Sequence, residues 1–210
     1  MTAVALGVIV SYLVGSIPFG YLAGKVLKGI DIRKYGSGNI GAANVLRTLG
    51  TGPGIILLLM DAGKGVFSVL VVASVAHRFA SPLNLSLLKA LCGVAAISGH
   101  DWSVFLRFRG GKGVATGLGV FFSLTPLYAL ASLVPFLVAV IVTKHVSVGS
   151  LVLAACFPAT MLIAGEPLSY SALGVFWLLS VIYLHRRNIR RLFRGAETRI
   201  GQKIQVSHEK

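Results

Sequence analysis

The sequence feature that most constrains the fold is the run Gly113–Thr143, which holds 31 residues without a charged side chain. As a single helix this run would be about 46 Å long, whereas the hydrocarbon core of a bilayer is about 30 Å thick. Proline lacks an amide donor and disfavours helix in the residue before it, so we expect a break at Thr125 and Pro126. The run therefore predicts two membrane helices, a short one over Gly113–Leu124 and a longer one over Pro126–Thr143.

The composition agrees with a membrane protein. Hydrophobic residues make up 55% of the chain and charged residues 12%, with a mean hydropathy of +0.83, whereas soluble domains carry about 25% charged residues. The N-terminus lacks a basic region before its first apolar run, so we expect that run to be a retained span. We predict one all-α polytopic membrane domain over residues 1–200 and a polar tail over residues 201–210. Its seven transmembrane helices are the two above and five over Thr2–Gly24, Pro53–Ala76, Pro82–Gly99, Val148–Gly165 and Leu168–Leu184.

The basic residues predict the orientation of these helices. If the N-terminus lies outside, 17 of the 20 Lys and Arg residues fall in the inner loops and the C-terminal tail, and Arg78 alone falls in an outer loop. Cytoplasmic loops are enriched in Lys and Arg, so we predict an external N-terminus and a cytoplasmic C-terminus. The same bias explains the net charge of +14 without a nucleic-acid partner, which so basic a soluble chain would suggest.

The two cysteines give no sign of a metal site or a disulfide. Cys92 and Cys156 lie in apolar runs without CxxC spacing or a nearby histidine. We expect both to be small buried hydrophobic residues.

Polar and glycine residues concentrate in the predicted inner loops. These read KGIDIRKYGSGNIGAANVLRTLG, GHDWSVFLRFRGGKGVATG and TKHVSVGS, and the tail begins HRRNIRRLFRGAETRIG, whereas the outer connections HRFASP, SLTPL and AGEPL are short. Polar chemistry on one side suits an enzyme with cytosolic reactants better than a carrier. A transporter and a non-catalytic membrane anchor are the alternatives, although no inverted repeat is visible.

The first inner loop contains GSGNIG at residues 36–41, which is spelled like a dinucleotide-binding fingerprint. That fold needs a strand, a helix and an acidic residue about 20 positions further on, but Asp61 at that spacing falls within a predicted span. The segment RGGKGVAT is not a Walker A motif either, because Gly113 follows Lys112 where Ser or Thr is required.

Both glycine-rich loops nevertheless have the chemistry of a phosphate site. Consecutive small residues allow several backbone amides to converge on an anion, and Ser37, Asn39 and Asn44 add polar side chains. Arg47 can make a two-pronged contact with phosphate, and Lys112 a point-charge contact. The alternative is that the glycines only form tight turns and the cations only anchor the chain at the membrane surface.

Further ionisable residues are candidates for the site. Asp61 and Lys64 share one helix face, either as a structural pair or as part of a pocket lining. His100 ends the third predicted span and is either a general base or a helix-end residue. His185 and Asn188 also share a face, where they suit substrate binding better than nucleophilic catalysis.

Three inner segments resemble the motifs of a known family. In chain order they read GSGNIGAANVLRTLG, GHDWSVFLRFRGGKGVATGLG and HRRNIRRLFRGAETRIG, and they resemble the bacterial acyl-phosphate glycerol-3-phosphate acyltransferases, the PlsY family. The likeness covers nearly the whole chain except residues 201–210. It implies a monomeric enzyme of the bacterial cytoplasmic (inner) membrane, with no cofactor, no metal and an active site that faces the cytoplasm.

The resemblance also implies the reaction. A fatty acyl group would move from acyl phosphate to the 1-hydroxyl of sn-glycerol 3-phosphate, which gives lysophosphatidic acid and inorganic phosphate in the first acylation of phospholipid synthesis. Acyl phosphate is already activated, so we hypothesise direct attack by the substrate hydroxyl, with catalysis by positioning and charge stabilisation. The proton acceptor would be the leaving phosphate, His100 or His185.

Roles for individual residues follow from the resemblance. The phosphate of acyl phosphate would be bound by Ser37, Gly38, Asn39, Gly41, Ala42, Ala43 and Asn44. Glycerol 3-phosphate would be held by Arg47, Lys112, Ser150, His185 and Asn188. Candidate catalytic residues are His100, Lys112 and His185, and candidate pocket-lining residues are Asp61, Lys64 and Ser147. Some family members have Thr where this chain has Ala43, so one hydroxyl contact to phosphate is expected to be missing.

Overall fold

The computed structural model describes residues 1–79 and 82–202. Within these residues all regular structure is helical and no strand occurs, which confirms the all-α prediction. Most of the expected polar tail, from residue 203 on, lies outside the described residues. The helices are α1 (Thr2–Ser16), α2 (Phe19–Lys28), α3 (Ala42–Thr48), α4 (Thr51–Phe67), α5 (Ala73–Arg78), α6 (Leu85–Asp101), α7 (Val114–Leu124), α8 (Pro126–Thr143), α9 (Val146–Ile163), α10 (Leu168–Leu184) and α11 (Arg186–Phe193), with short turns of helix η1 (Ile32–Lys34), η2 (Ser68–Val72) and η3 (Val104–Leu106).

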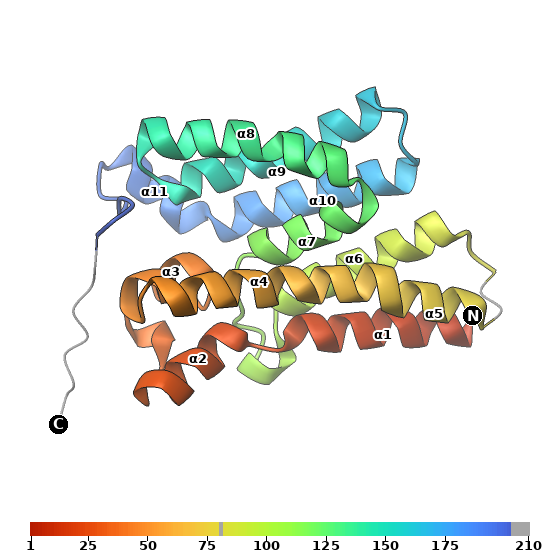
Figure 1. Ribbon diagram of the computed structural model, residues 1–210, viewed down its shortest axis with the longest axis horizontal. Helices are drawn as coiled ribbons and strands as arrows, with labels where there is room; N and C mark the ends of the chain where they lie inside the picture. Colours follow the sequence, from red (N-terminus) through yellow and green to blue (C-terminus); the bar gives the residue numbers. More distant parts are fainter. Residues whose placement is uncertain (80–81, 203–210) are drawn as a thin grey trace.

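The long helices run roughly along one direction and form two groups (Figure 1). In the first group α1 packs on α6, and α4 and α5 continue one another through the π-helical turn η2. In the second group α9 packs between α8 and α10, and α7 packs on α4 and so joins the two groups. The start of α1 and the helix α11 lie at opposite ends of the molecule (Figure 1).

Several helices have the length and composition of membrane spans. Among residues 1–79 and 82–202, four segments meet both criteria, and α10 with α11 adds a fifth if this pair, bent by 56°, is counted as one. Helix α7 has only 11 residues, so it is short, as the sequence predicted for Gly113–Leu124. The four segments are Thr2–Lys28, Thr51–Arg78, Pro126–Thr143 and Val146–Ile163.

Pro18 and Pro126 each mark a helix boundary, and of these two only the one at Pro126 was expected. The break at Thr125 is confirmed, because α7 ends at Leu124 and Pro126 is the first residue of α8, a position where its missing amide costs nothing. The first expected span corresponds to the candidate span Thr2–Lys28, which consists of the two helices α1 and α2. It is interrupted after Ser16 by Pro18, and the carbonyl of Ile17 at the interruption accepts from the amide of Phe19 at 3.1 Å.

The core of the second group is aromatic. The rings of Phe121 and Phe157 stack with centroids 4.1 Å apart, and Trp177 lies 5.2 and 5.3 Å from them. The indole nitrogen of Trp177 donates a hydrogen bond of 3.0 Å to the carbonyl oxygen of Gly113. This bond fixes the start of α7, directly after Lys112.

The outward faces of the helices are apolar. On α8 the side chains of Leu127, Leu130, Val134, Leu137 and Ile141 are all exposed. Contiguous exposed apolar surface is unusual in a soluble monomer, whereas lipid solvates it. The exterior therefore agrees with a protein that lies in a bilayer.

Candidate active site

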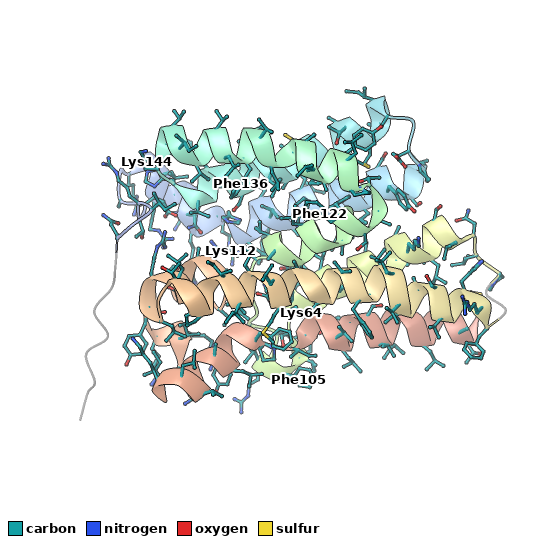
Figure 2. The ribbon with its side chains drawn as sticks, viewed as in Figure 1. Lys64, Phe105, Lys112, Phe122, Phe136 and Lys144 are labelled. Carbon is teal, nitrogen blue, oxygen red and sulfur yellow. The ribbon has the colours of Figure 1, made fainter. Side chains whose placement is uncertain are left out.

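A polar cluster surrounds Lys112, which lies between the two helix groups (Figure 2). The ammonium group of Lys112 donates a hydrogen bond to Oδ1 of Asn188 on α11. Nδ2 of Asn188 donates to Glu197 Oε1 at 2.5 Å, and Arg191 Nε donates to Glu197 Oε2 at 2.7 Å. Lys112 is joined in this way to a group of residues near the end of the chain, the first of them 76 positions away.

The cluster carries an excess of positive charge. Burial lowers the pKa of Lys112 to about 8; the charges of Arg191 and Arg47 act in the same direction, and that of Glu197 opposes them. Burial also lowers the pKa of Arg47 on α3, which is near enough to sense Glu197 and Arg191. Three cations therefore share one carboxylate, which is the electrostatic environment of an anion site.

The imidazole of His185 is buried beside this cluster at the junction of α10 and α11. Its Nδ1 lies 2.9 Å from the carbonyl oxygen of Val181, and because a carbonyl only accepts, Nδ1 carries the proton. Burial and then the charge of Lys112 lower the pKa of His185 to about 4. His185 is therefore neutral at pH 7, with Nε2 as its accepting nitrogen.

The segment after α11 positions Glu197, a residue that sequence reasoning missed. The amide of Ile200 donates to the carbonyl of Lys144 at 2.8 Å, and His145 Nδ1 lies 3.3 Å from the carbonyl of Thr198. Burial would raise the pKa of Glu197, but hydrogen bonds from Asn188 and Arg191 lower it below its usual value. The available signal was a lone acidic residue in HRRNIRRLFRGAETRIG.

The two serines of α9 lie near its start. The hydroxyl of Ser150 donates to the carbonyl of Val146 at 2.9 Å, and Ser147 lies beside Glu197. Both serines are buried. The structure thus brings Ser147 next to the Lys112 cluster and gives the Ser150 hydroxyl a partner within its own helix.

The first glycine-rich loop is held together by Asn44. Its Oδ1 accepts from the amide of Ser37 at 2.9 Å, and its Nδ2 donates to the carbonyls of Asn39 and Tyr35 at 2.8 and 3.1 Å. Asn44 is 1% exposed. Its side chain therefore shapes the loop, with both of its polar atoms engaged there.

What the loop leaves available is mostly backbone. Oδ1 of Asn39 accepts from the amide of Gly41 at 2.7 Å, whereas the amides of Ala42 and Ala43 have no hydrogen-bond partner within residues 1–79 and 82–202. Gly38 has a φ of +72°, which most other residues adopt only with strain. The loop can thus present amides to an anion without a hydroxyl at position 43.

A second polar group is buried beneath the Lys112 loop. Lys64 Nζ, which can donate three hydrogen bonds, lies 2.9 Å from Asp61 Oδ1, 3.0 Å from His100 Nδ1 and 3.1 Å from the carbonyl oxygen of Ile17. All three side chains are at most 4% exposed. Asp61 and Lys64 thus form an ion pair on one helix face, as their spacing predicts, and Lys64 also donates to the carbonyl of Ile17, the residue before Pro18.

His100 supports the loop that precedes Lys112. Its carbonyl oxygen accepts from the amide of Gly111 at 2.9 Å, and its ring lies so close to Gly111 that a Cβ there would collide with Nε2. With Nδ1 facing Lys64 and Nε2 against the loop, the geometry favours a structural role for His100 over the expected acid–base role. Asp61 and Lys64 likewise form part of this support, and neither is among the residues that line the cavity described below.

The sequence matches a protein family over most of its length. Residues 5–195 fit the family model described as glycerol-3-phosphate acyltransferase. The chain belongs to this family. The acyltransferase chain is 44% identical to the glycerol-3-phosphate acyltransferase of Synechococcus elongatus over 208 residues, which cover 99% of each chain. It is 46% identical to that of Desulforudis audaxviator over 200 residues, which cover 95% and 96% of the two chains.

Solved structures give the same result. The crystal structure of PlsY (YgiH), an integral membrane glycerol 3-phosphate acyltransferase, in its glycerol 3-phosphate form superposes with a TM-score of 0.85 at 36% identity, and covers 94% of this chain and 96% of that one. Its lysophosphatidic acid form superposes with a TM-score of 0.83 at the same identity. The resemblance to the PlsY family is therefore confirmed, as is an integral membrane protein of apolar helices.

Proposed function

We propose that this acyltransferase chain moves a fatty acyl group from acyl phosphate to the 1-hydroxyl of sn-glycerol 3-phosphate. The products are lysophosphatidic acid and inorganic phosphate, and the reaction is the first acylation of bacterial phospholipid synthesis. The observation that carries the proposal is the cluster of Arg47, Lys112 and Arg191, each half-buried, around a single carboxylate. Family membership supports the same assignment.

In this proposal the two phosphates occupy neighbouring sites. Glycerol 3-phosphate binds at Arg47, Lys112 and Asn188, with His185 and Ser150 as further contacts. The phosphate of acyl phosphate binds the first loop, over residues 37–44, where the amides of Ala42 and Ala43 are available. Helix α3 links the two sites, because it begins at that loop and carries Arg47 near its end.

The chemical step needs no covalent intermediate. The 1-hydroxyl oxygen attacks the acyl carbonyl carbon, the bond between that carbon and the phosphate oxygen breaks, and phosphate leaves with the electron pair. Lys112 stabilises the charge that develops near it. The hydroxyl proton passes to the leaving phosphate or to Nε2 of His185, which is unprotonated at neutral pH.

We also propose seven transmembrane helices with an external N-terminus and the active site facing the cytoplasm of a bacterial inner membrane. The distribution of Lys and Arg supports this orientation, as does the position of α11 at the opposite end of the molecule from the start of α1 (Figure 1). A monomer suffices for this site, because all of its residues come from one chain.

The direct test is an assay of phosphate release by the purified full-length protein, in lipid that supports its activity. We expect release only when both acyl phosphate and glycerol 3-phosphate are present, with lysophosphatidic acid as the coupled product. Release from acyl phosphate alone at the same rate would indicate a phosphatase, and no release would contradict the proposal. Detection of an acylated protein on the reaction path would exclude direct attack.

The pKa of Lys112 predicts the pH dependence of the reaction. Lys112 is charged below about pH 8, and a phosphate monoester loses its second proton near pH 6. We therefore expect kcat/KM for glycerol 3-phosphate to rise through about pH 6 and to fall as pH rises through about 8, because kcat/KM reports groups of the free enzyme and the free substrate. The measurement is a pH profile of kcat/KM. The alkaline fall should be absent in Lys112→Arg, and a fall that this variant retains would exclude Lys112 as its source.

A further inference from the structure

A basic cavity lies on a different part of the surface from the Lys112 cluster. It has a volume of about 460 Å³, and none of the residues that line it contributes to that cluster. Its walls come from α2, η1 and the segment that connects α6 to α7, and consist of Tyr21, Arg33, Phe105, Leu106, Arg107 and Arg109.

The charge of this cavity is not balanced within the described part of the chain. Asp31 binds Arg33, with Nη2 2.7 Å from Oδ2, and so neutralises that one cation. Arg107 and Arg109 form no ion pair within residues 1–79 and 82–202. Guanidinium groups favour planar contacts with phosphate, so two unpaired arginines facing a third predict a phosphate-bearing ligand.

The segment that carries these arginines is held in a fixed conformation. Arg107 and Phe108 are consecutive non-glycine residues with φ of +53° and +60°, a conformation that costs about 1–3 kcal/mol per residue. The amide of Phe108 donates to the carbonyl of Ser103 at 2.8 Å, and the hydroxyl of Ser103 donates to the carbonyl of Ser16 at 2.5 Å. The arginines are therefore presented by a prebuilt turn.

A buried residue anchors the turn from within. Leu106 is 6% exposed and packs in a hydrophobic cluster with Ile32, Ile40, Val45 and Leu57. The phenylalanines one position before it and two positions after it, by contrast, are exposed. Phe105 and Phe108 are 59% and 61% exposed, and Figure 2 places Phe105 at the edge of the α1–α2 side, away from Phe136 and Lys144.

Exposed phenylalanines beside unpaired arginines indicate which source of phosphate fits the cavity. Aromatic and basic residues together are typical of the membrane interface, and anionic headgroups attract juxtamembrane cations. A free phosphate ion would use the arginines alone, whereas a lipid would also contact the aromatic rim with its acyl chains. The exposed rings therefore favour a lipid.

We infer that the cavity formed by Tyr21, Arg33, Arg107 and Arg109 binds the headgroup phosphate of an anionic phospholipid of the surrounding membrane. Arg107 and Arg109 contact the phosphate, and Phe105 and Phe108 lie among the lipid chains. This site requires only that the chain lies in a membrane, and does not depend on the proposed acyl transfer.

The test compares lipid binding by purified full-length variants in neutral detergent. Short-chain phosphatidylglycerol is the anionic probe, phosphatidylcholine the zwitterionic probe and inorganic phosphate the free ion. Each is added to the protein at increasing concentration, and the shift in the thermal unfolding midpoint measures its binding. In Arg107→Asn/Arg109→Gln the cations are removed, and Asn is chosen at position 107 because it tolerates positive φ. The control Arg190→Gln/Arg194→Gln removes equal charge from two exposed positions of α11 and its C-cap.

Wild type and the control are expected to bind phosphatidylglycerol about tenfold more tightly than phosphatidylcholine, a difference equal to about 1.4 kcal/mol. The variant Arg107→Asn/Arg109→Gln should lose this preference. Acyl transfer in neutral detergent should be unchanged in that variant. If it folds poorly, Arg109→Gln alone carries the test, since Arg109 has ordinary backbone geometry. The inference is overturned if the preference persists without the arginines, if wild type has none, or if inorganic phosphate competes as well as the lipid. Loss of acyl transfer in Arg107→Asn/Arg109→Gln would overturn the statement that the lipid site is separate from the active site.

Discussion

Lys112→Ala is expected to lower kcat/KM for glycerol 3-phosphate by about 10²- to 10³-fold, the range found when one donor to a developing negative charge is removed. Two losses combine in this variant. The substrate phosphate loses a charged contact in a buried site, and Asn188 loses the donor to its Oδ1, which loosens the link to Glu197. Steady-state kinetics with glycerol 3-phosphate varied at saturating acyl phosphate give the measurement.

Two controls make this result specific. Lys112→Arg keeps the charge and should retain more activity than Lys112→Ala, and Arg190→Gln removes an exposed cation of α11 and should leave the kinetics unchanged. Thermal unfolding shows whether each variant is folded. A folded Lys112→Ala with wild-type kcat/KM would remove Lys112 from the active site and with it the main support for the proposed chemistry.

Lys64→Met is expected to lower the free energy of unfolding by about 3–5 kcal/mol, the scale for removal of one partner of a buried ion pair. Met has a similar length but cannot donate, so Asp61 would be left as a buried carboxylate with only the ring of His100, at 3.5 Å, near it. The carbonyl of Ile17 would keep only the amide of Phe19 as a donor. Unfolding in detergent, monitored by helical circular dichroism, gives the measurement.

The double variant Asp61→Asn/Lys64→Met separates charge from packing. Asn has nearly the shape of Asp without its charge, so we expect the double variant to be more stable than Lys64→Met alone, because no uncompensated charge stays buried. If the double variant were less stable than the single one, the ion pair would not be the source of the effect. Arg78→Gln, at the end of α5, is a suitable comparison for the loss of a cation outside the cluster.

The parts of the fold that local sequence determines were predictable. Absence of charge over Gly113–Thr143 and a proline at position 126 were enough to place α7 and α8, and a spacing of three was enough to pair Asp61 with Lys64. The same proline rule applies to Pro18, where the expected first span overlooked it. Helix α3 was not expected, since its seven residues are too few for a clear apolar period.

The site was predictable in its residue types but less so in its contacts. Lys112 and Asn188 were singled out as charged and polar residues on the same predicted side, yet their hydrogen bond joins positions 76 residues apart. The contact between His100 and Lys64 spans 36 residues, and it favours a structural role among those that the sequence left open for His100. Such partners depend on how the helices pack, which one sequence does not specify.

The attachment of residues 198–200 to the turn between α8 and α9 has a practical consequence for handling the protein. A load applied to the chain after residue 202 would pull on the stretch that keeps Glu197 in place. Helix α1 starts at the far end of the molecule (Figure 1), so an affinity tag for immobilisation or single-molecule work is better joined there.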